Sequence, residues 1–276
     1  MENMISNQLA TLGHPQRLSV FRTLMRRIPD QVAAGDLAEA LDIKPSTLSN
    51  YLNALQRCGL VTQERSGTSL LYSVELKNVQ EMLGFLLNDC CRGRPDICMP
   101  LERGKGTMTD RKFNVLFICV GNSARSIFAE SLLRDIAGDR FNAYSAGTMP
   151  YSELNPFALQ VLNDKGHDTS VLRSKNVTEF SGPDAPELDF VFTVCNNAAN
   201  EECPAWEGQP ISGHWGMTDP VRAEGTDAEK SLAFQNAYGA LRRRIQAFAS
   251  LPAESLDQIA LQTAVDDIGR TPEDLR

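Results

Sequence analysis

The feature that most constrains this chain is a cysteine followed, after five residues, by an arginine, between a strand pattern and a helix pattern. Residues 113–118 read Phe-Asn-Val-Leu-Phe-Ile, which predicts a buried strand, and Cys119 follows directly. After Arg125, residues 126–137 carry apolar side chains at helical spacing. The same alternation continues in an apolar run at 190–195 and helical segments at 156–164 and 230–248. Strands alternating with helices predict an α/β domain with a parallel sheet.

The loop from Cys119 to Arg125 has the composition of an anion-binding site. At a helix N-terminus, unpaired backbone N–H groups and the helix dipole attract a tetrahedral oxyanion and favour the thiolate form of a nearby cysteine. Cys119 is therefore the expected nucleophile, and Arg125 presents a planar fork for two oxyanion oxygens. Glycine and asparagine tolerate the backbone dihedrals of such a loop, and serine can hydrogen-bond the thiolate. The predicted oxyanion contacts are Gly121, Asn122, Ser123, Ala124, Arg125 and Ser126.

Two later segments indicate which oxyanion chemistry is involved. Residues 190–203 end a buried strand at Cys195 and reach Cys203, and residues 214–220 read His-Trp-Gly-Met-Thr-Asp-Pro. Together with the Cys119 loop, they resemble the low-molecular-weight phosphatase superfamily over residues 113–250. The likeness is to its arsenate reductase branch, because a phosphatase has no use for the two extra cysteines. The resemblance implies that fold, the reduction of arsenate to arsenite, and Asp219 as the general acid that protonates the departing oxygen.

A relay of three thiols follows from what this reduction requires. Cys119 attacks arsenate, and a second thiolate must then attack sulfur so that two electrons pass to arsenic. Cys195 is the predicted second thiol, and Cys203 would resolve the Cys119–Cys195 disulfide where a thioredoxin-like reductant can reach it. No tightly bound cofactor is expected. The alternatives are structural roles for Cys195 or Cys203, a non-catalytic oxyanion-binding domain, and a fused low-molecular-weight protein-tyrosine phosphatase.

The chain departs from this resemblance at several positions. Some relatives hold potassium beside the loop, and Asn122, Glu130 and Ser145 match that site. The matching acid near Asn176 and Thr178 is missing, which makes potassium doubtful as a cofactor. Ala124 stands where some relatives have another cysteine, and the Cys195–Cys203 interval is one residue longer than in some relatives.

The first part of the chain carries a helix-turn-helix pattern. Apolar residues recur at helical spacing, and a turn at 42–44 separates two short helices within 34–60. Pro45 begins the second helix, the candidate recognition helix. Its outward positions are small hydrogen-bonding residues suited to base edges and phosphates: Ser46, Thr47, Ser49, Asn50, Asn53 and Gln56. Residues 61–72 alternate around a Ser66-Gly67 turn, predicting a β-wing that sets Arg65 against the phosphate backbone.

Two segments in this part carry a second resemblance. Residues 12–18, Leu-Gly-His-Pro-Gln-Arg-Leu, and 46–52, Ser-Thr-Leu-Ser-Asn-Tyr-Leu, resemble the ArsR/SmtB-type winged-helix repressors, over residues 5–98. The resemblance implies a homodimer, paired through its first and last helices, that presents two recognition helices to a palindromic operator. The alternative is a winged helix used only for protein contact.

Three cysteines close together follow the winged-helix pattern. Cys90 and Cys91 end a helical run, and Cys98 lies beyond a turn that folds the chain back. Arsenite takes three thiolates, whereas zinc requires a fourth ligand, and His14 is the only histidine in this part. Arsenite is therefore the expected inducer, although buried cysteines without a ligand are an alternative. Cys58 is interpreted as a core residue.

Composition sets the outer limits of the interpretation. The expected organisation is a DNA-binding and arsenite-sensing domain at 1–99, a linker at 100–112, a reductase domain at 113–250 and a helical tail at 251–276. Residues 1–110 hold 12 basic and 12 acidic residues, so bulk charge does not argue for DNA binding. No apolar run approaches the roughly 20 residues that span a bilayer, so membrane association is not expected. Without a signal-peptide pattern, a cytoplasmic location is expected.

Overall fold

The computed structural model describes residues 2–90, 111–182, 184–200, 206, 210–256 and 258–273. It divides into two compact units, Met1–Met108 and Thr109–Arg276. Apart from residues 111 and 112, the predicted linker lies outside the described residues. Among the described residues, no helix is long and apolar enough to cross a membrane.

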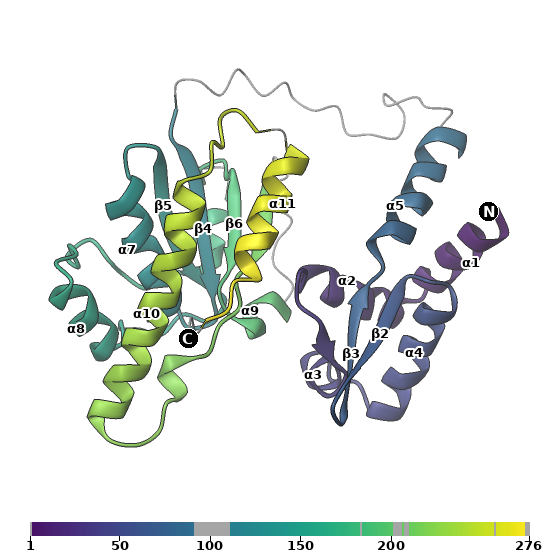
Figure 1. Cartoon of the computed structure of the whole chain (residues 1–276), viewed down its shortest axis with the longest axis horizontal. Helices are drawn as coiled ribbons and strands as arrows, with labels where there is room; N and C mark the ends of the chain where they lie inside the picture. Colours follow the sequence, from purple (N-terminus) through teal and green to yellow (C-terminus); the bar gives the residue numbers. More distant parts are fainter. Residues whose placement is uncertain are drawn as a thin grey trace. The chain divides into compact units, whose positions relative to one another are not determined.

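The first unit is a winged helix-turn-helix (Figure 1). Its antiparallel sheet has the strand order β1-β3-β2, and the hairpin β2–β3 forms the wing. Proline opens α2 and α4, where its fixed φ suits the first helical position. The elements are α1 (Glu2–Leu12), α2 (Pro15–Arg26), β1 (Val32–Ala33), α3 (Ala34–Ala40), α4 (Pro45–Arg57), β2 (Val61–Ser66), β3 (Ser69–Val74), α5 (Leu76–Phe85) and the π-helix η1 (Leu86–Cys90). The predicted fold class of this part is confirmed.

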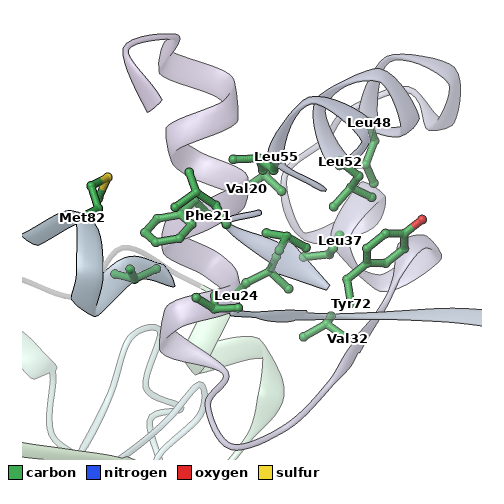
Figure 2. Packing of buried hydrophobic residues seen from close by; sticks show 14 of the residues in the cluster. Val20, Phe21, Leu24, Val32, Leu37, Leu48, Leu52, Leu55, Tyr72 and Met82 are labelled. Atoms are coloured by element: carbon green, nitrogen blue, oxygen red, sulfur yellow. The ribbon is translucent and has the colours of Figure 1, made fainter. Parts of the chain in front are cut away.

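The core of this unit explains which face of α4 points outward. Leu48, Leu52 and Leu55 recur at helical spacing on α4 and are buried. Figure 2 shows them turned toward the same interior as Val20 and Leu24 of α2. Burying these leucines fixes the rotation of the helix, so its polar positions face away from the core.

The second unit is an α/β domain built on four parallel strands (Figure 1). The strands are β4 (Phe113–Cys119), β5 (Phe141–Gly147), β6 (Phe190–Thr193) and β7 (Ile211–His214), in the order β5-β4-β6-β7. The helices are α7 (Arg125–Ala137), α8 (Pro156–Asp164), α9 (Asn196–Asn200), α10 (Asp227–Ala249) and α11 (Gln258–Gly269), with 3-10 turns η2 (Val177–Phe180) and η3 (Pro220–Arg222). The predicted parallel α/β class is confirmed. Cys119 is the last residue of β4, an inner strand, and therefore lies at the carboxyl edge of the sheet, where ligands bind in such folds.

Aromatic side chains fill the space between this sheet and α10. Phe192 stacks on Trp215 with ring centroids 4.1 Å apart, and Phe248 of α10 meets both rings edge-on. The indole nitrogen of Trp215 donates to the carbonyl oxygen of Val265 at 3.2 Å, which ties α11 to this core.

Candidate active site and recognition helix

The loop between β4 and α7 wraps around the sulfur of Cys119. The backbone N–H of Asn122 donates to this sulfur at 3.1 Å, and the hydroxyl oxygen of Ser126 lies 2.9 Å from it. Asn122 has a φ of 42°, in the left-handed region that turns successive N–H groups to one side. Cys119 is 3% exposed. The loop therefore holds one buried sulfur against a backbone N–H and a serine hydroxyl.

The side chain of Asn122 holds the loop in this conformation. Its amide nitrogen donates to the hydroxyls of Ser126 at 2.9 Å and Ser145 at 2.8 Å, and its oxygen accepts the N–H of Lys175 at 2.7 Å. A neighbouring glycine is required for space, because a Cβ on Gly147 would lie 2.5 Å from the carbonyl oxygen of Val120. The sequence pattern did not reveal Gly147, because this constraint arises from two segments that meet only in the fold.

A buried ion pair supports the loop from behind. The amine of Lys175 donates to the carboxylate of Glu130 at 2.9 Å, and both side chains are 8% exposed. Ser145 donates to the same carboxylate oxygen. The Lys175 ammonium thus neutralises the Glu130 carboxylate, which the sequence resemblance matched to a potassium ligand. Asn176 and Thr178 hydrogen-bond each other at the start of η2, so the described residues do not fit a potassium ion.

Arg125 and Asp219 meet at the mouth of the loop. Their side chains form an ion pair at 2.7 Å and are 11% and 26% exposed, respectively. A second nitrogen of Arg125 donates to the carbonyl oxygen of Met217 at 3.1 Å. Asp219 also accepts the N–H of Val221 at 3.2 Å, which caps η3. The structure therefore brings the predicted general acid to the arginine of the loop.

Cys195 lies at the end of the strand next to Cys119. Strands β4 and β6 pair through Ile118 and Thr193, and the N–H of Val194 donates to the carbonyl oxygen of Ile118 at 2.8 Å. Burial raises the pKa of the Cys195 thiol, the charge of Cys119 raises it further, and Arg125 acts in the opposite direction. The two thiols are thus close enough for the charge of Cys119 to act on Cys195. Cys203 lies outside the described residues.

A histidine that the sequence singled out only as part of a motif anchors the chain on both sides of Cys195. His214 Nδ1 lies 2.8 Å from the hydroxyl of Thr193, and its Nε2 lies 3.1 Å from the side-chain oxygen of Asn196. His214 is 2% exposed. This bridge holds β6 and α9 together around the cysteine.

One side of the loop opens on a shallow cavity of about 270 Å³. Tyr151 covers Gly121 so closely that a Cβ there would lie 2.5 Å from the tyrosine ring. The segment around Tyr151 is fixed to the loop, because the N–H of Tyr151 donates to Gly121 and that of Asn155 to Ser123. The cavity is lined by Ser123, Tyr151, Ser152, Glu153, Leu154, Asn155, Pro156 and Val221.

The predicted DNA contacts of the first unit lie on the outer face of α4 and on the wing. None of the predicted side chains on α4 is buried, and Arg65 of the wing is exposed. Two exposed basic residues flank the helix, Lys44 at its N-cap and Arg57 at its last residue. Neither residue was among the helix contacts predicted from the sequence, which were all small hydrogen-bonding residues. Of the predicted arsenite ligands, Cys90 is exposed at the end of η1, whereas Cys91 and Cys98 lie outside the described residues.

The geometry defines a class of protein: an α/β domain with a buried cysteine in the loop between its first strand and the helix that follows, joined to a winged helix. The profile described as "Low molecular weight phosphotyrosine protein phosphatase" matches residues 114–259, and the one described as "Helix-turn-helix domain" matches residues 12–64. The chain belongs to the low molecular weight phosphotyrosine protein phosphatase family.

Individual relatives are similar to the second half of the chain. The chain is 37% identical to an arsenate reductase of Bacillus licheniformis over 139 residues, which are 50% of this chain and 96% of the relative. It is 36% identical to an arsenate reductase of Bacillus subtilis over 135 residues, 49% of this chain and 94% of that one. A crystal structure of arsenate reductase from Archaeoglobus fulgidus aligns with a TM-score of 0.40 and 21% identity, covering 50% of this chain and 99% of the other.

Proposed function

We propose that the second unit reduces arsenate to arsenite through Cys119, Cys195 and Cys203, and that the first unit is an arsenite-responsive DNA-binding repressor. The observation that carries the enzymatic half is the pair of thiols at the ends of adjacent strands, with one thiol inside the anion loop. A phosphatase needs only the first of these thiols. Similarity to curated arsenate reductases over nearly their whole length supports the same assignment.

The first step is attack of the Cys119 thiolate on the arsenic of arsenate. A sulfur–arsenic bond forms, the bond from arsenic to one of its hydroxyl groups breaks, and Asp219, which acts in its carboxylic acid form, gives its proton to the departing hydroxyl, which leaves as water. Arg125 and the loop N–H groups hold the remaining oxygens. The N–H of Asn122 and the hydroxyl of Ser126 hold the attacking sulfur in place.

The second step transfers the electrons. The Cys195 thiolate attacks the Cys119 sulfur, a disulfide forms, and the electron pair of the breaking sulfur–arsenic bond stays on arsenic, which leaves as arsenite. Cys203 then attacks Cys195, which frees the Cys119 thiolate and leaves a Cys195–Cys203 disulfide. An external dithiol of the thioredoxin type reduces this disulfide and restores all three thiols.

The enzymatic proposal is tested with reduced protein, arsenate, and thioredoxin with its NADPH-dependent reductase. We expect arsenate-dependent NADPH oxidation that is lost in Cys119→Ser, Cys195→Ser and Cys203→Ser. Hydrolysis of p-nitrophenyl phosphate is measured in parallel. Fast hydrolysis without arsenate-dependent NADPH oxidation would replace the reductase assignment by the phosphatase alternative, and absence of both activities would leave only an oxyanion-binding module.

The regulatory half rests on the outer face of α4. Its exposed polar side chains, the flanking Lys44 and Arg57, and Arg65 on the wing suit a helix that enters the major groove with basic contacts to phosphates. In this proposal the chain is a homodimer on a palindromic operator, and arsenite binds Cys90, Cys91 and Cys98. Arsenite then lowers the affinity for the operator by the factor by which it binds the DNA-free dimer more tightly than the DNA-bound dimer.

A gel-shift titration tests this half. Wild-type protein should bind an operator fragment and dissociate when arsenite is added, whereas Cys91→Ser should bind DNA normally and remain bound. If Cys91→Ser dissociates at the same arsenite concentration as wild type, the proposed inducer site is wrong. If neither protein binds the upstream DNA of its own gene, the repressor assignment fails.

A further inference from the structure

The C-terminal segment of the chain, residues 258–273, folds back onto the loop that carries Asp219. Most of this segment lies beyond residue 259, where the family match ends. Helix α11 packs on the edge strand β7, where the side chain of Gln262 donates to the carbonyl oxygen of Ser212 at 2.7 Å. Gly213 leaves room for this packing, since a Cβ there would lie 2.7 Å from the side chain of Val265. The segment is thus built into the domain.

A buried arginine ties this segment to the active-site loop. Arg244 of α10 is 4% exposed and donates to the carbonyl oxygens of Trp215 at 2.9 Å and Gly216 at 3.2 Å. Its other terminal nitrogen donates to the carbonyl oxygens of Gly269 at 3.4 Å and Thr271 at 3.0 Å. One guanidinium therefore fixes the start of the loop and the end of the C-terminal segment relative to each other.

Glu273 then contacts the loop one residue before the predicted acid. Its carboxylate accepts the backbone N–H of Thr218 at 3.0 and 3.2 Å and the Thr218 hydroxyl at 3.4 Å. Its own carbonyl oxygen accepts a hydrogen bond from Arg243, which holds the residue in place. The neighbouring Met217 and Asp219 are the two partners of Arg125. Glu273 thus holds the loop at Thr218, which lies between the two partners of Arg125.

We propose that Glu273 is a positioning residue that orients the Asp219 carboxyl toward the anion loop, so that the C-terminal segment is part of the active site. This inference rests on the proposed function of Asp219 as the acid. Glu273 does not touch Arg125 or Cys119 in any described contact, so it acts through the backbone of Thr218. Hydrogen bonds from a backbone N–H to a carboxylate are charge-assisted and directional, which suits them to fixing a loop.

A double-mutant cycle between Glu273 and Asp219 in the full-length chain tests the proposal. We expect Glu273→Ala to lower the rate of arsenite formation at saturating arsenate about tenfold, part of what a general acid contributes. Its KM for arsenate should change less, because the loop donors are intact. In the Glu273→Ala background, Asp219→Asn should cost little more, because the acid is already misplaced. Glu273→Gln keeps one acceptor oxygen and should restore part of the rate.

Matched measurements separate positioning from folding. Asp267→Ala removes another acid of the segment, one whose contact is with Arg270 at 2.6 Å, and should leave the rate unchanged. Amide exchange at Thr218 should accelerate in Glu273→Ala and not in Asp267→Ala. Rate losses that simply add in the double mutant, or an unchanged rate in Glu273→Ala, would overturn the proposal, as would a loss that only follows the unfolded fraction.

The cycle is run in parallel on hydrolysis of p-nitrophenyl phosphate, which needs the same protonation of a departing oxygen. If the wild type hydrolyses the ester but forms no arsenite, the reductase assignment fails while the coupling of Glu273 and Asp219 is still measured. A wild type that performs neither reaction overturns both proposals.

Discussion

Replacing Lys175 by methionine should destabilise the second unit strongly, because it removes the nearer counter-charge of the buried Glu130 carboxylate and leaves only Arg134, whose guanidinium lies 4.0 Å away. The lysine and glutamate side chains are each 8% exposed and their charged atoms lie 2.9 Å apart. Removing one partner of a buried ion pair costs about 3–5 kcal/mol of unfolding free energy. For a unit of this size, that corresponds to a fall in Tm of about 6–20 °C. The effect should reach the anion loop through Ser145 and Asn122.

Tryptophan fluorescence measures this change selectively, because Trp206 and Trp215 are the two tryptophans of the chain and both belong to the second unit. The control is Lys165→Met, which removes an exposed lysine from the same unit. Adding Glu130→Gln to Lys175→Met should recover part of the lost stability, because no unpaired charge remains buried. The reasoning is refuted if Lys175→Met costs no more than Lys165→Met, or if Glu130→Gln makes the Lys175 variant less stable still.

Three further predictions follow from named contacts. Gly147→Ala should weaken phosphate binding, measured as the ligand-induced rise in Tm, because its Cβ would lie 2.5 Å from the Val120 carbonyl oxygen. The control Gly182→Ala, whose Cβ would meet nothing within 4 Å, should bind phosphate normally. Since burial raises the pKa of Cys195 and the thiolate attacks, the rate of Cys119–Cys195 disulfide formation should rise with pH through and above the ordinary thiol range; a falling rate contradicts this. Arg65→Ala should weaken binding to every DNA sequence alike and reduce the salt slope by about one; a sequence-dependent loss would show that Arg65 contacts bases.

The strand–loop–helix around Cys119 was predictable because its signals are local. The apolar run, the Cys-x5-Arg spacing and the helical periodicity all lie within residues 113–137, and β4 and α7 form there. The same holds for α4, whose buried leucines and opening proline are both visible in the sequence. A local sequence pattern is sufficient to predict a helix or strand when the residues that it buries all lie within that element.

Strands β5 and β7 were not predicted, because neighbours rather than their own residues make them strands. Residues 141–147 include an asparagine, two alanines and a glycine, and residues 211–214 include a glycine; these residue types weaken strand propensity. Pairing with β4 and β6 supplies what propensity lacks.

The support of the site was also hidden from the sequence. Lys175 reaches Glu130 across 45 residues, and Glu273 reaches Thr218 across 55, so no spacing rule connects them. The sequence resemblance matched three residues of a potassium site but left the ion doubtful; Lys175, one residue before Asn176 and three before Thr178, supplies the positive charge. Long-range polar contacts of this kind become visible only once the fold is known.

The central claim is that protein thiols supply the electrons that reduce arsenate. Its most direct test mixes fully reduced protein with arsenate in the absence of any external reductant and counts protein disulfides and arsenite together, because arsenite bound at Cys90, Cys91 and Cys98 would also mask free thiols. The account predicts that one disulfide, which consumes two thiols, forms for each arsenite, that reaction stops after a single turnover, and that Cys119→Ser forms none. Arsenite formed without loss of thiols, or formed equally by Cys119→Ser, would contradict it.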